Sequence, residues 1–299
     1  MAKRNGPAAN RAARTAWGPI VQVALEQYVP SEQRIVQDAL AYRFLPVYLR
    51  LLVRAVSPKA MRERLLAAID RRIPGIRGGI LCRKRYIDES LADALTSGLD
   101  AVVILGAGMD TRGCRLPRGG IPAYEVDLPP NIAVKTATLR RVFDEVPAHI
   151  RFAPADLELQ DVGPVLQAAG YAPGGAAFFI LEGVTQYITE ATVRRLLASL
   201  QIAGAGSRLV FTYIRRDFIE GREMYDLELL YRQTRIRQSF WHFGLEPESV
   251  GAFLEPYGWH EVEQAGSEEY QARYLRPVGR ALPVMPVERI VCAVKGYAP

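Results

Sequence analysis

Short apolar runs alternate with helical segments between residues 100 and 213, and this alternation most constrains the fold. The clearest run is residues 100–105 (Asp-Ala-Val-Val-Ile-Leu), which ends at Gly106. Its β-branched content and glycine boundary predict a fully buried parallel strand. We predict further strands at residues 123–127, 151–156, 176–181 and 206–213, with helices at 129–143 and 190–203. The pattern predicts an α/β fold with an open, mostly parallel sheet.

Segments without this alternation flank and interrupt the predicted sheet. Residues 19–95 show mostly helical spacing, and the small, basic residues before about position 16 are expected to be frayed. Residues 214–248 are rich in charged and aromatic side chains and predict a helical insertion. Residues 257–262 and 288–295 predict closing strands. We therefore expect an N-terminal helical leader or lid over 1–96 and a main domain over 97–299, with 214–248 as a lid over the substrate.

Composition excludes several classes of protein. The 299 residues include 38 Lys+Arg and 32 Asp+Glu, a net charge of +6. This surplus is modest, and without a dense basic stripe we expect no nucleic-acid partner. The longest uncharged stretch, 162–181, contains prolines and glycines and is interpreted as a loop that runs into a buried strand, so we expect no membrane partner.

The cysteines and histidines indicate neither a disulfide framework nor a metal site. The three cysteines are far apart with no Cys-x-x-Cys pair, and no histidine has the spacing of metal ligands. Reduced thiols and the absence of an apolar signal segment favour a cytoplasmic location. The sequence leaves the oligomeric state open.

The most informative loop follows the first strand. Gly106 and Gly108 allow a sharp turn and close approach to a ligand. Asp127 closes the next strand, where a dinucleotide-type fold places a carboxylate on ribose hydroxyls. The third glycine of a Gly-x-Gly-x-x-Gly motif is missing, and Asp110 would repel a pyrophosphate. S-adenosylmethionine, which has a ribose, an adenine and a sulfonium but no phosphate, fits better; the alternative is a tight turn without a ligand.

Residues 103–112 (Val-Ile-Leu-Gly-Ala-Gly-Met-Asp-Thr-Arg) resemble the first motif of the leucine carboxyl methyltransferase family. That family includes bacterial members that act on small molecules. Residues 124–129, 155–157 and 181–187 resemble its next three motifs, and 83–88 resemble the Arg-containing helix before its first strand. The resemblance implies methyl transfer from S-adenosyl-L-methionine, with S-adenosyl-L-homocysteine as product and no metal. It also implies a Rossmann-like, seven-stranded, mostly parallel sheet with helices on both faces.

The resemblance implies roles for three residues at the methionine end of the cofactor. Arg83 pairs with its carboxylate, with Arg85 as the alternative, and Glu182 faces its amino group. From the residues alone, Arg83 also fits a solvated charged face. Glu182 follows a buried strand, where a carboxylate needs a charged partner, and the cofactor's ammonium would supply one.

Five further residues are implied to bind the nucleoside. Gly106 and Gly108 line the methionine and ribose, and Asp127 holds the ribose hydroxyls. Asp156 accepts a hydrogen bond from the adenine amino group, and the backbone of Leu157 lies beside the ring. From the residues alone, both aspartates also fit helix caps.

Three residues are candidates for the chemistry. A carboxylate acceptor is ionised near pH 7 and needs no base, whereas a phenol benefits from one. His242 is the candidate base for a phenol, although a histidine among aromatic residues is more commonly packed. Tyr187 and Tyr213 are candidates to orient the acceptor oxygen, or else they pack in the core.

The insertion favours an anionic, ring-bearing acceptor. It is rich in aromatic residues and contains six arginines that either clamp a carboxylate or lie on a solvated face: Arg215, Arg216, Arg222, Arg232, Arg235 and Arg237. Our first hypothesis is an O-methyltransferase that acts by in-line displacement on a carboxylate, or a phenol, of a small aromatic or polyketide-like secondary metabolite. The alternatives are a protein C-terminal carboxyl methyltransferase, a non-catalytic S-adenosylmethionine-binding protein and an RNA-modifying enzyme.

Overall fold

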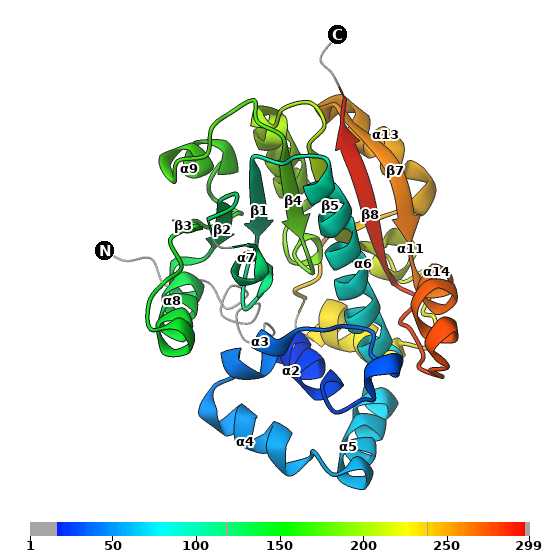
Figure 1. Cartoon of the computed structure of the whole chain (residues 1–299). Coiled ribbons are helices and arrows are strands. Elements are labelled where there is room, and N and C mark those ends of the chain that lie inside the picture. The colour runs from blue at the N-terminus through cyan, green and yellow to red at the C-terminus, as the bar shows by residue number, and fades with distance from the viewer. Residues whose placement is uncertain (1–16, 118, 238, 297–299) are drawn as a thin grey trace.

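A single sheet forms the centre of the molecule (Figure 1). The computed structural model describes residues 17–117, 119–237 and 239–296, so the segment expected to be frayed lies outside the described residues. The strand order is β3-β2-β1-β4-β5-β8-β7. The strands are β1 (Ala101–Leu105), β2 (Ala123–Asp127), β3 (Ile150–Pro154), β4 (Ala177–Leu181), β5 (Arg208–Arg215), β7 (Trp259–Ala265) and β8 (Glu288–Lys295). All neighbours are parallel except β8, which runs antiparallel to both β5 and β7.

Helices cover both faces of the sheet, as predicted. One face carries α6 (Ile76–Thr96), α8 (Pro129–Phe143) and α14 (Ser267–Tyr270), and the other carries α9 (Val162–Ala168), α10 (Glu190–Ser199) and α13 (Val250–Leu254). Side chains of β1 alternate between the two cores: Val102 and Ile104 pack on the first side, and Val103 and Leu105 on the second. Burial on both faces explains why this strand is apolar throughout.

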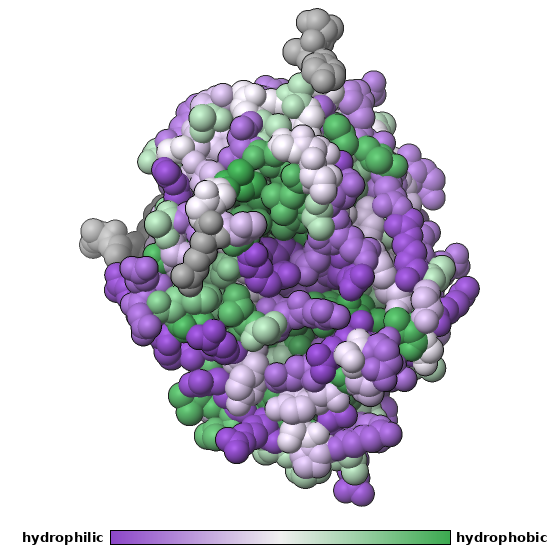
Figure 2. Space-filling view, viewed as in Figure 1, coloured by the Kyte–Doolittle hydropathy of each residue, from purple (hydrophilic) through white to green (hydrophobic). Residues whose placement is uncertain are grey.

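From residue 17 onward, the described N-terminal region contributes four helices that lie beyond the carboxyl ends of the parallel strands (Figure 1). They are α2 (Trp17–Glu26), α3 (Ala39–Phe44), α4 (Val47–Ala55) and α5 (Lys59–Arg72). Asp38 caps α3 by accepting hydrogen bonds from two backbone N–H groups of its first turn. Val47 and Leu51 of α4 are exposed apolar side chains. Figure 2 shows that hydrophobic residues also reach the surface in the part of the molecule where the N-terminal helices lie. Helix α6, which also belongs to the predicted leader 1–96, packs against β4 and β8. The N-terminal region therefore supplies one of the helices that cover the sheet.

The structure confirms the predicted strands and the helical character of the insertion, and it corrects two details. Residues 162–168, predicted as a loop, form α9. The sheet has an eighth strand, the two-residue β6 (Gly244–Leu245), which pairs with β5. The predicted insertion contains α11 (Arg216–Ile219), α12 (Glu228–Tyr231) and a π-helical turn at Arg232–Arg237. None of the helices in the described part of the chain combines the length and apolar character needed to cross a membrane.

Candidate functional site

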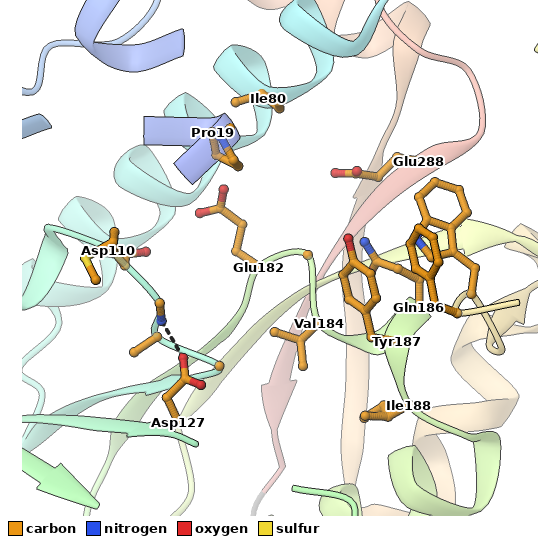
Figure 3. Close-up of a pocket in the computed structure, with 18 of the residues that line it drawn as sticks. Pro19, Ile80, Asp110, Asp127, Glu182, Val184, Gln186, Tyr187, Ile188 and Glu288 are labelled. Atoms are coloured by element: carbon orange, nitrogen blue, oxygen red, sulfur yellow. Dashed lines mark hydrogen bonds between the residues drawn. The ribbon is translucent and has the colours of Figure 1, made fainter. Parts of the chain in front are cut away.

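A cavity of about 550 Å³ lies at the carboxyl ends of β1, β2, β3 and β4. Its wall also includes residues of α2, α6, the segment 230–241 and the start of β8. Figure 3 shows Asp110 and Asp127 on one side, Tyr187 and Ile188 on the other, and Glu182 between them. The lining contains all seven residues predicted to bind a cofactor: Arg83, Gly106, Gly108, Asp127, Asp156, Leu157 and Glu182.

The loop after β1 has the sharply turned backbone conformation that its two glycines predict. Gly106 and Gly108 adopt φ values of 72° and 44°, in the left-handed region that favours glycine. A Cβ atom at Gly106 would lie 2.4 Å from Cγ2 of Val184, so a side chain has no room there. The loop can therefore bring its backbone to the cavity, and only glycine fits at Gly106.

Asp127 anchors this loop. Its Oδ2 atom accepts a hydrogen bond of 2.6 Å from the backbone N–H of Gly108 (Figure 3). Its Oδ1 atom accepts hydrogen bonds of 2.7 Å from the Leu128 N–H and from Asn131 Nδ2. An ionised carboxylate has about four acceptor sites, so Asp127 retains capacity for a further donor from the cavity. This arrangement fits a ribose hydroxyl.

Asp156 and Leu157 form the end of the cavity beyond β3. Asp156 Oδ1 accepts a hydrogen bond of 2.9 Å from the Glu158 N–H within a turn. The helix cap considered from the sequence is not formed there, because the next helix, α9, begins at Val162. Its Oδ2 atom makes no hydrogen bond to another described residue. One carboxylate can therefore both cap the turn and accept a hydrogen bond from a ligand in the cavity.

A buried charge cluster occupies the middle of the cavity wall. Arg83 Nε lies 3.0 Å from Glu182 Oε1, and its Nη1 lies 2.8 Å from Glu288 Oε1. Lys84 Nζ lies 3.2 Å from Glu182. Glu182 therefore already has charged partners within the chain, so its burial does not depend on a cofactor ammonium. Arg85 instead pairs with Glu89 and is not part of the lining, so Arg83 is the arginine that borders the cavity.

Arg112 connects this cluster to the glycine loop. Its side chain is 1% exposed, and it pairs with Glu182 at 2.7 Å, with Asp88 at 2.6 Å and with Asp110. Burial disfavours ionisation of Glu182, but Lys84, Arg112 and Arg83 outweigh it and lower the pKa of its carboxyl. The pKa of Asp110 is lowered in the same way, where Arg112 overcomes the effect of burial. These acids are therefore charged at neutral pH.

The other half of the cavity is apolar and aromatic. Tyr187 stacks on Phe240, with ring centroids 5.7 Å apart and an interplanar angle of 8°. The Tyr187 hydroxyl makes no hydrogen bond to the described residues. Gln186 Oε1 and Trp241 Nε1 are buried and form no hydrogen bond with any described residue. Both residues line the cavity. Unmet hydrogen bonds of this kind are uncommon in proteins and fit a wall that meets a polar ligand.

Two residues predicted for the chemistry are not brought to the cavity. Tyr213 is fully buried and its hydroxyl donates a hydrogen bond of 2.7 Å to Gln264 Oε1, while burial raises the pKa of the phenol. His242 is exposed and does not line the cavity. Of the three candidates, only Tyr187 is in the lining.

Four of the six arginines considered for a clamp are engaged elsewhere. Arg215 pairs with Asp217, Arg216 with Glu190, and Arg222 with Glu220. Arg235 donates to backbone carbonyls. None of the insertion's arginines lines the main cavity.

Several residues of the site were missed from the sequence. Arg112 belongs to the first motif, but nothing in the sequence indicated that it would pair with three carboxylates. Glu288 is the first residue of the closing strand and pairs with Arg83, which is far from it in sequence. Lys84, Gln186 and Trp241 gave no separate signal. Among the residues that the structure describes, no group of three His, Cys, Asp or Glu side chains is arranged to hold a metal ion.

The strand order and the cavity at the carboxyl ends of the parallel strands define a doubly wound α/β domain. The fold is similar to that of a protein described as a putative methyltransferase from Thermobifida fusca, with a TM-score of 0.55 and 17% identity over 80% of this chain and 89% of that one. It is also similar to a DUF574 family protein from Streptomyces avermitilis, with a TM-score of 0.52 and 15% identity over 79% of this chain and 91% of that one.

The sequence comparisons identify the family. Residues 16–201 match the sequence model of the leucine carboxyl methyltransferases. The chain is 34% identical over 229 residues to a "Putative S-adenosyl-L-methionine-dependent methyltransferase" of Mycobacteroides abscessus, with 69% of each chain covered. A protein of Mycobacterium avium with the same description is 30% identical over 216 residues, or 68% of this chain and 67% of that one. The chain belongs to the leucine carboxyl methyltransferase family.

Proposed function

We propose that this chain, an S-adenosylmethionine-dependent methyltransferase, transfers a methyl group to a carboxylate or phenolic oxygen of a small, ring-bearing molecule. The division of the cavity into an acidic half and an apolar, aromatic half carries this proposal. The acidic half suits a cationic cofactor, and the apolar half suits the body of the acceptor. A protein C-terminal carboxyl methyltransferase, a non-catalytic S-adenosylmethionine-binding protein and an RNA-modifying enzyme are the alternatives that a labelling experiment distinguishes.

The charges of the lining fit S-adenosylmethionine. Two cationic side chains, Arg83 and Lys84, face six acids: Asp110, Asp127, Asp156, Glu158, Glu182 and Glu288. When bound, the cofactor supplies an electrophilic methyl group on a sulfonium. Asp127 would accept hydrogen bonds from the ribose hydroxyls and Asp156 from the adenine amino group. Glu182 would accept from the ammonium, and Arg83 and Lys84 would donate to the carboxylate.

The apolar half would orient the acceptor and exclude water. The Tyr187–Phe240 stack offers a flat surface for a ring, and the Tyr187 hydroxyl is available to donate a hydrogen bond to the reacting oxygen. A carboxylate acceptor is already ionised at neutral pH and requires no base. Its charge would be balanced by the neighbouring sulfonium, so the acceptor half needs no arginine of its own. Holding the oxygen in line with the methyl group is then the main contribution to the rate.

Tyr187→Phe is expected to lower kcat/KM for the acceptor by about two- to ten-fold, the effect of one hydrogen bond. The stacking on Phe240 is retained, so the cofactor dissociation constant should not change. Steady-state kinetics and calorimetry measure the two quantities. Tyr213→Phe is the matched control, because the Tyr213 hydroxyl is bonded to Gln264 outside the cavity. Equal losses in the two variants would argue against a positioning role for Tyr187.

The proposed function is tested by incubating the protein with methyl-labelled S-adenosylmethionine and a panel of aromatic acids, phenols, peptides and RNA. We expect label in an aromatic acid or a phenol. Release of the label by mild base would identify a carboxyl ester, and resistance to base an aryl ether. Label found only at a peptide C-terminus or in RNA would overturn the proposal, as would cofactor binding without transfer to any acceptor.

A further inference from the structure

We propose that a second pocket, beside the acceptor half of the main cavity, binds an oxyanion group carried at the far end of the acceptor. This inference rests on the proposed function and deepens it by naming a second chemical feature of the substrate. The pocket has a volume of about 490 Å³. Three of its lining residues are arginines: Arg72, Arg232 and Arg237.

The charges of these three arginines are not balanced within the described chain. None of them forms an ion pair or a side-chain hydrogen bond with a described residue. Other arginines of the same insertion do so: Arg215 pairs with Asp217 at 2.7 Å and Arg216 with Glu190 at 3.0 Å. The contrast means that positive charge is concentrated at this pocket. Guanidinium groups match the geometry of carboxylates and phosphates and bind them with paired hydrogen bonds.

The position of the pocket links it to the acceptor. Leu230 and Gln233 line both the main cavity and this pocket. Arg232 and Arg237 belong to the π-helical turn that also contributes Gln233 and Thr234 to the main cavity, while Arg72 ends α5. Two separate elements therefore contribute exposed arginines to the lining of one pocket that adjoins the acceptor half. An acceptor bound in the main cavity would meet this second pocket where the two share Leu230 and Gln233.

The first experiment measures the binding of inorganic phosphate by calorimetry to the wild-type protein and to R72Q, R232Q and R237Q. Each substitution is expected to raise the dissociation constant for phosphate about three- to ten-fold. R71Q is the matched control, since Arg71 is the neighbouring exposed arginine of α5 and is not in the lining. The melting temperatures of all four variants should equal that of the wild type, which verifies that these substitutions of exposed residues leave the fold intact. Equal effects of R71Q, or no effect of the three variants, would overturn the inference.

The second experiment compares acceptors in pairs that differ only by a distal carboxylate or phosphate. The wild-type protein is expected to favour the acceptor with the distal group by at least ten-fold in kcat/KM, and R232Q/R237Q to lose most of that preference. The carboxylate and phosphate series distinguish the two forms of the oxyanion. No preference in either series would overturn the inference. If no acceptor is methylated, the proposed function fails, while the phosphate titration still decides whether the pocket binds an oxyanion.

Discussion

Replacing Asp127 by alanine is expected to raise the dissociation constant for S-adenosylmethionine by about 100-fold or more. Hydrogen bonds to a charged group contribute about 1.5–3 kcal/mol each, and each 1.4 kcal/mol corresponds to a factor of ten. The substitution removes the acceptor proposed for the ribose hydroxyls. It also removes the carboxylate that holds the Gly108 N–H at 2.6 Å and so fixes the glycine loop. Isothermal titration calorimetry measures the affinity directly.

Three further variants make this result specific. Asp127→Asn keeps the shape of the side chain but not its charge, and we expect a smaller loss than with alanine. Asp161→Ala removes a largely exposed carboxylate that does not line the cavity and should leave the affinity unchanged. Glu182→Ala is expected to weaken the binding of the cofactor as well. Unchanged affinity in both Asp127→Ala and Glu182→Ala would refute the proposed arrangement of the cofactor.

Arg112→Met is expected to lower the free energy of unfolding by about 3–5 kcal/mol, the cost of breaking a buried ion pair from one side. Arg112 pairs with three carboxylates, those of Asp88, Asp110 and Glu182, and its side chain is 1% exposed. Methionine fills a similar volume but leaves these acids without their shared cation. Urea denaturation followed by circular dichroism gives the change. Arg112→Lys keeps the charge but not the planar guanidinium, so its free energy of unfolding should fall between those of the wild type and Arg112→Met. An Arg112→Met variant as stable as the wild type would contradict a stabilising role for the cluster.

The same cluster predicts how stability depends on pH. Burial opposes ionisation of Asp88 and Glu182, but the neighbouring cations lower the pKa of both carboxyls in the folded protein. In the unfolded chain they take up protons near their ordinary pKa values of 3.8 and 4.5. Their contribution is therefore fully present above about pH 5 and is lost as the pH falls towards the lower folded values. Arg112→Met should show a shallower loss of stability with acid, because part of that contribution is already absent.

The sequence predicted the strands of the sheet well because most are buried on both faces and bounded by turn residues. The predicted bounds of β2 and β8 agree with the structure at every residue. Residues 162–168 were misjudged because Gly163 and Pro164 suggested a loop, whereas Pro164 is tolerated in the first turn of the short helix α9. Strand β6 has only two residues and carries no recognisable pattern.

The site could be predicted only where its residues belong to local motifs. Gly106, Gly108 and Asp127 follow strands whose ends meet at one edge of the sheet, so their proximity follows from the fold. The pairing of Arg83 with Glu288 joins residues 205 positions apart and depends on where β8 enters the sheet. His242 was misjudged for a local reason: Trp241 and Phe243 are buried on either side of it, which leaves the histidine exposed.

The position of β8 also determines what a chain without this strand would lose. This strand lies between β5 and β7, and it is the neighbour of β7 in the sheet. Until residues 288–295 have been made, β5 presents an open strand edge, which is prone to pair with other chains, and β7 has nothing to join. Glu288 reaches Arg83 only when this strand is inserted. A chain that lacks residues 288–295 would therefore leave the edge of β5 open to pairing with other chains and would lack Glu288 in the cavity wall, so both the sheet and the site depend on this strand.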